Sequence, residues 1–247
     1  MDDLSLPPAE ETTEELSPKA QLEAEATKRF QWHWAPLRVA GQPWKIATAS
    51  DPDGMLIEAC ERQDAGETGV IDPFWAAVWR ASAGLDKFLD RYELEGTQVL
   101  ELGCGTGRAG LSAALRGANV TLTDGVDDPL LLVRLTCWDL AERCRILRLR
   151  FGQDRLEGET FPLILGSDVT YLRQLWPELD HCLRLHLEPN GEVLLSDPHR
   201  LIADEFRDWI QAAGWEYQQH SVALSDDPEH PIRVMQLRLP SDSQTSP

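Results

Sequence analysis

Short apolar runs and longer amphipathic stretches alternate along the chain from residue 72 onward. The apolar runs, such as "VLEL" and "LILG", are rich in valine, leucine and isoleucine, which is typical of buried strands. They predict seven strands, at 98–102, 119–124, 145–150, 161–167, 191–196, 215–223 and 231–239. The stretches between them predict helices at 107–116, 128–142, 173–186 and 200–213. Strands that alternate with helices form a mostly parallel sheet covered on both faces.

The last two expected strands break this alternation, because no helix separates 215–223 from 231–239. Successive strands without a crossover helix pair antiparallel, so these two are expected to form a hairpin at the edge of the sheet. Residues 72–240 are therefore expected to form one α/β domain. Its core is a doubly wound, mostly parallel seven-stranded sheet with an antiparallel C-terminal hairpin.

The start of this domain, "DPFWAAVWRASAGLDKFLD", is expected to be a helix. Asp72 is suited to cap it, and Pro73 fits the first helical turn. Such a helix would place Trp75 and Trp79, four positions apart, on one face.

Residues 29–71 have a different pattern, in which aromatic and β-branched residues are interrupted by Gly41, Pro43 and the turn sequence "DPDG". This predicts a small N-terminal β extension of two or three short antiparallel strands. Residues 1–28 hold eight acidic residues and two lysines among few apolar ones. We expect a disordered acidic arm there, with a nascent helix near "PKAQLEAEATKRF", and a frayed tail at 241–247.

Composition narrows the class of protein. The 247 residues suffice for one large domain with an appendage, and 42% of them are hydrophobic, enough for a packed core. No apolar run reaches the roughly 18 to 20 residues that span a bilayer, and the first residues are acidic where a signal peptide is basic. A soluble, cytoplasmic protein without membrane contact is therefore expected. The formal net charge of −19 repels nucleic acid and attracts basic partners.

Cysteine and histidine patterns do not indicate a metal centre. The five cysteines contain no C-x-x-C pair, and the six histidines have no spacing typical of zinc ligands. We expect reduced, mostly buried cysteines. We also expect a monomer, because one sheet with two helix layers accounts for the apolar positions.

The sequence "VLELGCGTGRAG" contains the first expected strand of the sheet and can be interpreted in two ways. Gly105, Gly107 and Gly110 form G-x-G-x-x-G, the turn that binds the pyrophosphate of a dinucleotide. Glu101 with Gly103, Gly105 and Gly107 instead forms an acidic residue before G-x-G-x-G, which resembles the first motif of S-adenosylmethionine-dependent methyltransferases. Both ligands need a turn without Cβ atoms, so glycine spacing alone leaves both open.

Further side chains are expected at the same edge of the sheet. Asp124 ends the second expected strand, where a carboxylate accepts both hydrogen bonds of a ribose diol in either class of enzyme. Asp168 and Tyr171 follow the fourth strand, where open α/β folds bind ligands. Glu101 stands where a dinucleotide fold usually has an apolar residue, and an acid there can orient the loop and approach a cationic ligand. These features favour the methyltransferase interpretation.

The segments "VWRAS", "VLELGCGTG", "TLTD" and "LILGSDVTY", in this order and spacing, resemble the family 16 methyltransferases, a seven-strand group that includes many protein-lysine methyltransferases. The resemblance covers roughly residues 72–239 and implies a Rossmann-like fold with S-adenosyl-L-methionine as cofactor. Its most specific pieces are the D-x-x-Y from Asp168 to Tyr171 and the upstream Trp79. It implies that Asp168 and Tyr171 border the substrate amine as catalytic residues. It also implies that the cofactor is bound by Trp79, Glu101, Gly103, Cys104, Gly105, Gly107 and Asp124.

The chain departs from this family pattern in two places. After the third strand the lysine methyltransferases often carry an Asp-Trp that contacts adenine, whereas this chain offers Phe151 and Gln153, of which Phe151 is the candidate for stacking. The N-P-P-Y type loop of adenine and glutamine methyltransferases is replaced by "SDVTY", which disfavours DNA and glutamine methylation. Core or surface positions, not site positions, are expected for Trp75, Trp138, Trp176, Trp209 and Trp215.

Together these features predict an S-adenosylmethionine-dependent N-methyltransferase that acts on a basic protein side chain, with lysine as the first choice. A small amine or a heteroaromatic nitrogen is the alternative acceptor. In the expected mechanism, Asp168 accepts a hydrogen bond from the incoming amine and Tyr171 positions it, while the proton leaves through water. An NAD(P)-dependent oxidoreductase is less favoured, since no Tyr-x-x-x-Lys occurs. A non-catalytic binding module is also less favoured, since the glycines and acids are all present.

Overall fold

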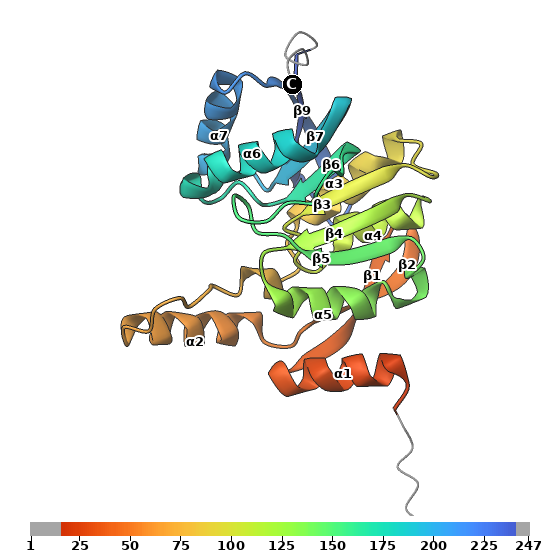
Figure 1. Cartoon of the computed structure of the whole chain (residues 1–247), viewed down its shortest axis with the longest axis vertical. Helices are drawn as coiled ribbons and strands as arrows, with labels where there is room; N and C mark the ends of the chain where they lie inside the picture. Colours follow the sequence, from red (N-terminus) through yellow and green to blue (C-terminus); the bar gives the residue numbers. More distant parts are fainter. Residues whose placement is uncertain (1–15, 241–247) are drawn as a thin grey trace, which may run out of the picture.

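A computed structural model describes residues 16–240 of the chain. A seven-stranded sheet forms the centre of the molecule (Figure 1). The strand order is β5-β4-β3-β6-β7-β9-β8. The bounds are β3 (Gln98–Leu102), β4 (Asn119–Asp124), β5 (Cys144–Arg148), β6 (Phe161–Ser167), β7 (Leu187–Asp197), β8 (Glu216–Leu224) and β9 (Asp227–Arg238). Strands β3 to β7 are parallel, whereas β9 runs antiparallel to both β7 and β8. The predicted fold class, including the C-terminal hairpin, is confirmed.

Helices cover both faces of this sheet because successive strand residues point to opposite faces. Val99 of β3 packs in one apolar cluster with residues of α4 and α5, while the next residue, Leu100, packs in a second cluster with residues of α6 and α7. The first face is covered by α3 (Ala81–Phe88), α4 (Arg108–Leu115) and α5 (Asp127–Thr136). The second is covered by α6 (Trp176–His186) and α7 (Leu201–Ala212).

The acidic arm is not disordered over its whole length. Residues Pro18–Arg29 form α1, capped by the Ser17 hydroxyl, and Figure 1 shows this helix lying along α5. The fully buried Ala26 packs in a small apolar cluster with Leu132 and Leu135 of α5. This tertiary contact outweighs the local charge and polarity on which the disorder prediction rested. Residues 1–15 and the predicted tail at 241–247 lie outside the described residues.

The N-terminal extension contains two strands and then a helix. Strands β1 (Trp32–Val39) and β2 (Gln42–Ala49) pair antiparallel as predicted, but the "DPDG" sequence begins α2 (Pro52–Asp64) and not a third strand. The Asp51 carboxylate caps this helix by accepting from the Gly54 amide at 2.9 Å. A Cβ at Gly54 would lie 2.2 Å from that carboxylate, so the tight cap requires glycine. Helix α2 projects from the body of the molecule in Figure 1.

The segment expected to open the main domain as one helix is broken. A single 3₁₀ turn spans Phe74–Ala76, Ala77 is extended with ψ 147°, and α3 begins only at Ala81. Trp75 and Trp79 therefore do not share a helix face. Long-range contacts hold this conformation: the Arg80 guanidinium donates to the backbone carbonyls of His230 and Asp227, in the first residues of β9, 2.6 and 2.8 Å away.

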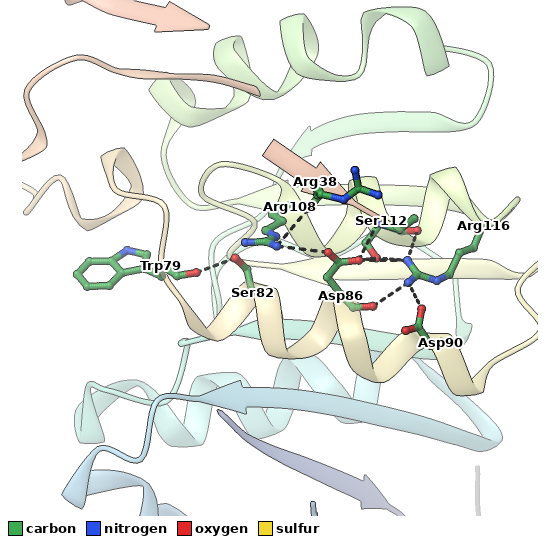
Figure 2. Close-up of polar contacts among 9 residues, drawn as sticks. Arg38, Trp79, Ser82, Asp86, Asp90, Arg108, Ser112 and Arg116 are labelled. Atoms are coloured by element: carbon green, nitrogen blue, oxygen red, sulfur yellow. Dashed lines mark hydrogen bonds and ion pairs between the residues drawn. The ribbon is translucent and has the colours of Figure 1, made fainter. Parts of the chain in front are cut away.

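A buried carboxylate connects the N-terminal hairpin to the main domain. Asp86 of α3 accepts from the backbone amide of Ala40, in the β1–β2 turn, at 2.9 Å and from the Ser112 hydroxyl of α4 at 2.7 Å. Figure 2 shows Arg108 and Arg116 of α4 converging on the same carboxylate. The Trp79 ring points away from this network, toward the other end of α3. The network therefore fixes the extension and α4, while Trp79 remains available to the cavity described below.

Candidate active site

The glycine turn after β3 has the backbone conformation that its sequence predicts. Gly103, Gly105 and Gly107 have φ angles of 61°, 50° and 76°, a region that residues with a Cβ seldom adopt. Gly107 is also the first residue before α4, and a Cβ there would press on the Val133 side chain at 3.1 Å. The turn thus leaves backbone atoms open at the carboxyl end of β3.

Glu101 lies beneath this turn and supports it. Its side chain is fully buried, and one carboxyl oxygen accepts from the Gly110 amide at 2.9 Å. Burial raises the pKa of Glu101 to about 8, although the Gly110 bond acts in the opposite direction. A Cβ at position 110 would lie 2.4 Å from this carboxyl, so Gly110 serves the close packing of α4 on β3. The acid therefore orients the loop from below.

Asp124, at the end of β4, holds the other side of the turn. One carboxyl oxygen accepts from the Gly105 amide at 3.0 Å and the other from the Val126 amide at 3.1 Å. Burial raises the pKa of Asp124, partly offset by these backbone bonds. Each oxygen keeps a free lone pair, so the carboxylate has the acceptors that a ribose diol needs.

A cavity of about 310 Å³ opens above the glycine turn. Six of the nine predicted site residues line it: Trp79, Gly103, Gly105, Asp124, Asp168 and Tyr171. The other three, Glu101, Cys104 and Gly107, lie in the layer below and shape the turn. The Cys104 backbone amide donates to the Thr123 carbonyl at 2.8 Å, which fixes the loop to β4. Phe151, the candidate for stacking on adenine, and Gln153 also line the cavity, in the segment after β5.

Asp168 is held in an ion pair that the sequence reasoning missed. Its buried carboxylate accepts from both the Nε and the terminal nitrogen of Arg200, at 2.8 and 2.7 Å. Arg200 follows β7 directly, and its backbone amide donates to Asp197. The signal was available, because the residues after β7 end at the same edge of the sheet as those after β6.

Aromatic rings form the outer wall around this ion pair. The Arg200 guanidinium lies 5.5 Å from the Trp79 ring centroid, and the Trp79 indole donates to the Phe74 carbonyl at 2.5 Å. Phe74 packs edge to face on Tyr171, with ring centroids 5.6 Å apart. Burial, reinforced by the charges of nearby carboxylates, raises the pKa of Tyr171, so its hydroxyl stays protonated and can donate.

Trp75 packs against the small apolar cluster of α1 and α5, as a core residue would, and it also reaches the cavity. It lines the cavity together with Ile71, Asp72 and Phe74, and its backbone lies 3.6 Å from where a Gly105 Cβ would be. This segment reaches the cavity because its helix is broken after Phe74–Ala76. The aromatic density of "DPFW" in front of the domain was the signal that could have identified it.

The described residues contain no group of three or more His, Cys, Asp or Glu side chains that could hold a metal ion. They also include no helix with the length and apolar character needed to cross a membrane. The cavity combines backbone amides, acceptors and aromatic walls. These groups suit an adenosine-containing ligand beside a cation or an amine.

The sheet order further defines the class of protein. With β3 counted as the first strand, the order is 3-2-1-4-5-7-6. The dinucleotide fold has the parallel order 3-2-1-4-5-6, whereas here an antiparallel seventh strand is inserted between the fifth and the sixth. Solved methyltransferases share this fold. A Thermus thermophilus 16S rRNA N2 G1207 methyltransferase aligns with a TM-score of 0.61 at 18% identity, over 85% of this chain and 51% of that one. The glycopeptide N-methyltransferase MtfA with bound S-adenosylmethionine aligns with a TM-score of 0.56 at 18% identity, over 65% of this chain and 87% of that one.

Sequence comparison identifies the family within this class. A model of the lysine methyltransferase family matches residues 62–231, and the chain belongs to that family. It is 35% identical over 141 residues to protein N-lysine methyltransferase METTL21A of Xenopus tropicalis, covering 54% of this chain and 63% of that protein. It is 36% identical over 137 residues to the electron transfer flavoprotein beta subunit lysine methyltransferase of Xenopus laevis, covering 52% and 54%. The matches thus span less than two thirds of these relatives.

Proposed function

We propose that the protein is an S-adenosylmethionine-dependent methyltransferase that acts on a lysine side chain of another protein. The observation that carries the proposal is one cavity with the glycine turn and Asp124 on one side and Asp168 with Tyr171 on the other. Membership of the lysine methyltransferase family supports methyl transfer over hydride transfer and over a non-catalytic role. Relatives named as protein-lysine methyltransferases favour a protein over a small amine.

The residues present fit this cofactor. The Asp124 carboxylate has free lone pairs for the ribose hydroxyls, and the glycine turn leaves room beside it for the methionine part. Phe151 and Gln153 line the cavity wall, which supports a contact with the adenine there, and Trp79 and Trp75 line it where they would cover the ligand. When bound, the cofactor supplies a methyl group on a positively charged sulfur. A neutral amine would attack the methyl carbon in line, and the sulfur would leave as a thioether.

The chain's task is then to orient a deprotonated amine. Each Asp168 oxygen keeps a free lone pair after binding Arg200, so the carboxylate can accept a hydrogen bond from the amine. Pairing with Arg200 largely cancels its charge, so Asp168 does not strongly favour the ammonium form of the substrate. Tyr171 positions the same nitrogen by accepting a second N–H hydrogen bond on its hydroxyl oxygen, which leaves the nitrogen lone pair free to attack, and the proton leaves through water.

We also propose that the protein works as a monomer in a reducing compartment such as the cytoplasm. Four of the five cysteines are buried, and an odd number of cysteines without a disulfide framework is typical of proteins in a reducing compartment. The two large apolar clusters between sheet and helices account for most of the buried hydrophobic residues, which supports a monomer.

The first experiment is calorimetric titration with S-adenosylhomocysteine and, separately, with NADH. Micromolar binding of S-adenosylhomocysteine that is weakened in Asp124→Asn supports the proposal, whereas binding of NADH alone refutes it. Transfer of labelled methyl groups is then followed in a protein extract, with lysine methylation identified by mass spectrometry. Electron transfer flavoprotein beta subunit, named in one relative, is a suitable purified probe.

A further inference from the structure

Exposed large hydrophobic side chains are concentrated around the mouth of the cavity. The described residues expose eight such side chains, and five of them belong to the segments that surround the cavity. These five, which we call the apolar rim, are Ile71, Val78, Trp79, Tyr171 and Leu201. The other three, Leu16, Ile57 and Leu185, belong to other segments. An apolar patch around an opening is typical of an interaction surface.

Three separate parts of the chain contribute to this rim. Ile71, Trp79 and Tyr171 line the cavity itself, and Val78 directly precedes Trp79. Leu201 is placed by its neighbour Arg200, which binds Asp168 and lies over the Trp79 ring. At 87% exposure, Leu201 is the most exposed large hydrophobic side chain of the described residues. Segments far apart in sequence therefore present apolar side chains around one opening.

The charges beside the rim fit a basic group at its centre. Four arginines lie in or beside the cavity wall, and each is paired with a carboxylate: Arg80 with Asp227, Arg150 with Asp154, Arg173 with Glu205, and Arg200 with Asp168. Asp72 lines the cavity and accepts a hydrogen bond from a neutral amide, that of Gln63, at 2.9 Å. A lysine that enters the cavity is close to hydrogen-bond acceptors, and the arginines nearby are neutralised by their carboxylate partners. Apolar side chains around that lysine would pack against the apolar rim.

The size of the cavity favours a macromolecule at this surface. A volume of about 310 Å³ is within the range of single small-ligand sites, and the cofactor takes most of it. A small amine would sit inside that cavity and leave Leu201 uncovered. A folded protein that inserts one lysine would cover the rim as well.

We propose that the apolar rim is the docking surface for a folded protein acceptor, which presents its target lysine from an apolar patch of its own. This inference rests on the proposed function and names the kind of substrate that the same site takes. Covering Leu201 and Val78, which do not line the cavity, would contribute to the affinity for the acceptor and not to the affinity for the cofactor.

The test uses two matched pairs of variants in the full chain. Leu201→Ser alters the rim and Leu185→Ser alters an exposed leucine on α6. Ile71→Ser and Ile57→Ser form the second pair, since the two isoleucines are 62% and 60% exposed. Methyl labelling is measured at saturating S-adenosylmethionine in a desalted extract of cells that lack this enzyme, either native or digested with pepsin. Titration with S-adenosylhomocysteine is repeated for each variant.

We expect Leu201→Ser and Ile71→Ser to lower the labelling rate of native protein by about tenfold, as is common for an exposed anchor residue at an interface. The two controls should stay within about twofold of the wild type, and the digest should be a poor substrate for all. Equal loss in all four variants, loss confined to Ile57→Ser, or equal labelling of native and digested extract would overturn the proposal. Failure to bind S-adenosylhomocysteine would instead refute the proposed function.

Discussion

Replacing Arg200 by methionine tests how far the Asp168 carboxylate depends on its partner. The Asp168 side chain is only 4% exposed and accepts two charge-assisted hydrogen bonds from Arg200. Removing one partner of a fully buried pair costs about 3–5 kcal/mol, because the other charge stays behind without compensation. Since the Arg200 side chain is 38% exposed, water replaces part of the guanidinium, and we expect a loss of about 2–3 kcal/mol. In a chain of this size that corresponds to a fall in Tm of about 4–12 °C.

Thermal unfolding followed by circular dichroism measures this effect, and the same helix offers a control. Arg207 is also 38% exposed, but its partners Asp204 and Asp208 are 49% and 71% exposed, so Arg207→Met should cost no more than about 0.5 kcal/mol. The double variant with Asp168→Asn should lose less than the sum of the two single variants, because it leaves no buried charge unpaired. The reasoning is refuted if Arg200→Met and Arg207→Met lower Tm equally, or if the single effects simply add.

Three further predictions concern the cavity and the residues beneath it. Asp124→Asn should weaken S-adenosylhomocysteine binding at least about tenfold in calorimetry, because a charged acceptor is lost; unchanged affinity would contradict the ribose assignment. Asp168→Ala should reduce turnover about a hundredfold while the affinity for S-adenosylhomocysteine stays within about threefold, and a variant with full activity would exclude the proposed role. Because burial raises the pKa of Glu101 to about 8, the folded state holds this proton more tightly than the unfolded chain. The stability gained from this proton is complete below the pKa of the unfolded chain and is lost as the pH rises to the folded pKa, so Tm should fall between about pH 5 and pH 8. The fall should be smaller in Glu101→Gln, and equal slopes in the two proteins would refute the role of Glu101.

The sheet could be predicted from the sequence because each strand is buried on both faces and leaves a continuous apolar signal. Predicted and observed bounds are the same for β3, β4 and β6. The site residues at the ends of β3, β4 and β6 followed from the rule that ligands bind at the carboxyl edge of a parallel sheet. Local pattern and topology were sufficient there, since neither depends on a partner distant in sequence.

The elements that were missed or only partly predicted depend on distant contacts. Helix α1 lies where a nascent helix was predicted, but its order depends on Ala26 packing against α5, which no local window contains. The break before α3 is held by hydrogen bonds from Arg80 to the first residues of β9. Arg200 stands in an ordinary "DPHR" sequence, and only its place at the same edge of the sheet as Asp168 indicates the pairing. Helix α2 is a different case, because Asp51 and Pro52 suit a turn and a helix start equally well.

The backbone at the site is strained, and hydrogen bonds of a residue near the end of β7 stabilise it. Four non-glycine residues among the described residues have a positive φ, and two of them are at the site. Asp168 itself has a φ of 54°, and His199, which directly precedes Arg200, has a φ of 64°. Such conformations cost about 1–3 kcal/mol each. Ser196 offsets part of this cost. Its carbonyl accepts from the Asp168 amide at 2.8 Å, and its hydroxyl donates to the Ala81 carbonyl, at the start of α3, at 2.9 Å. The loop that bears Asp168 and the segment that bears Trp79 are thereby fixed to one residue of β7, so the acid and the aromatic wall keep their spacing even though neither conformation is favoured locally.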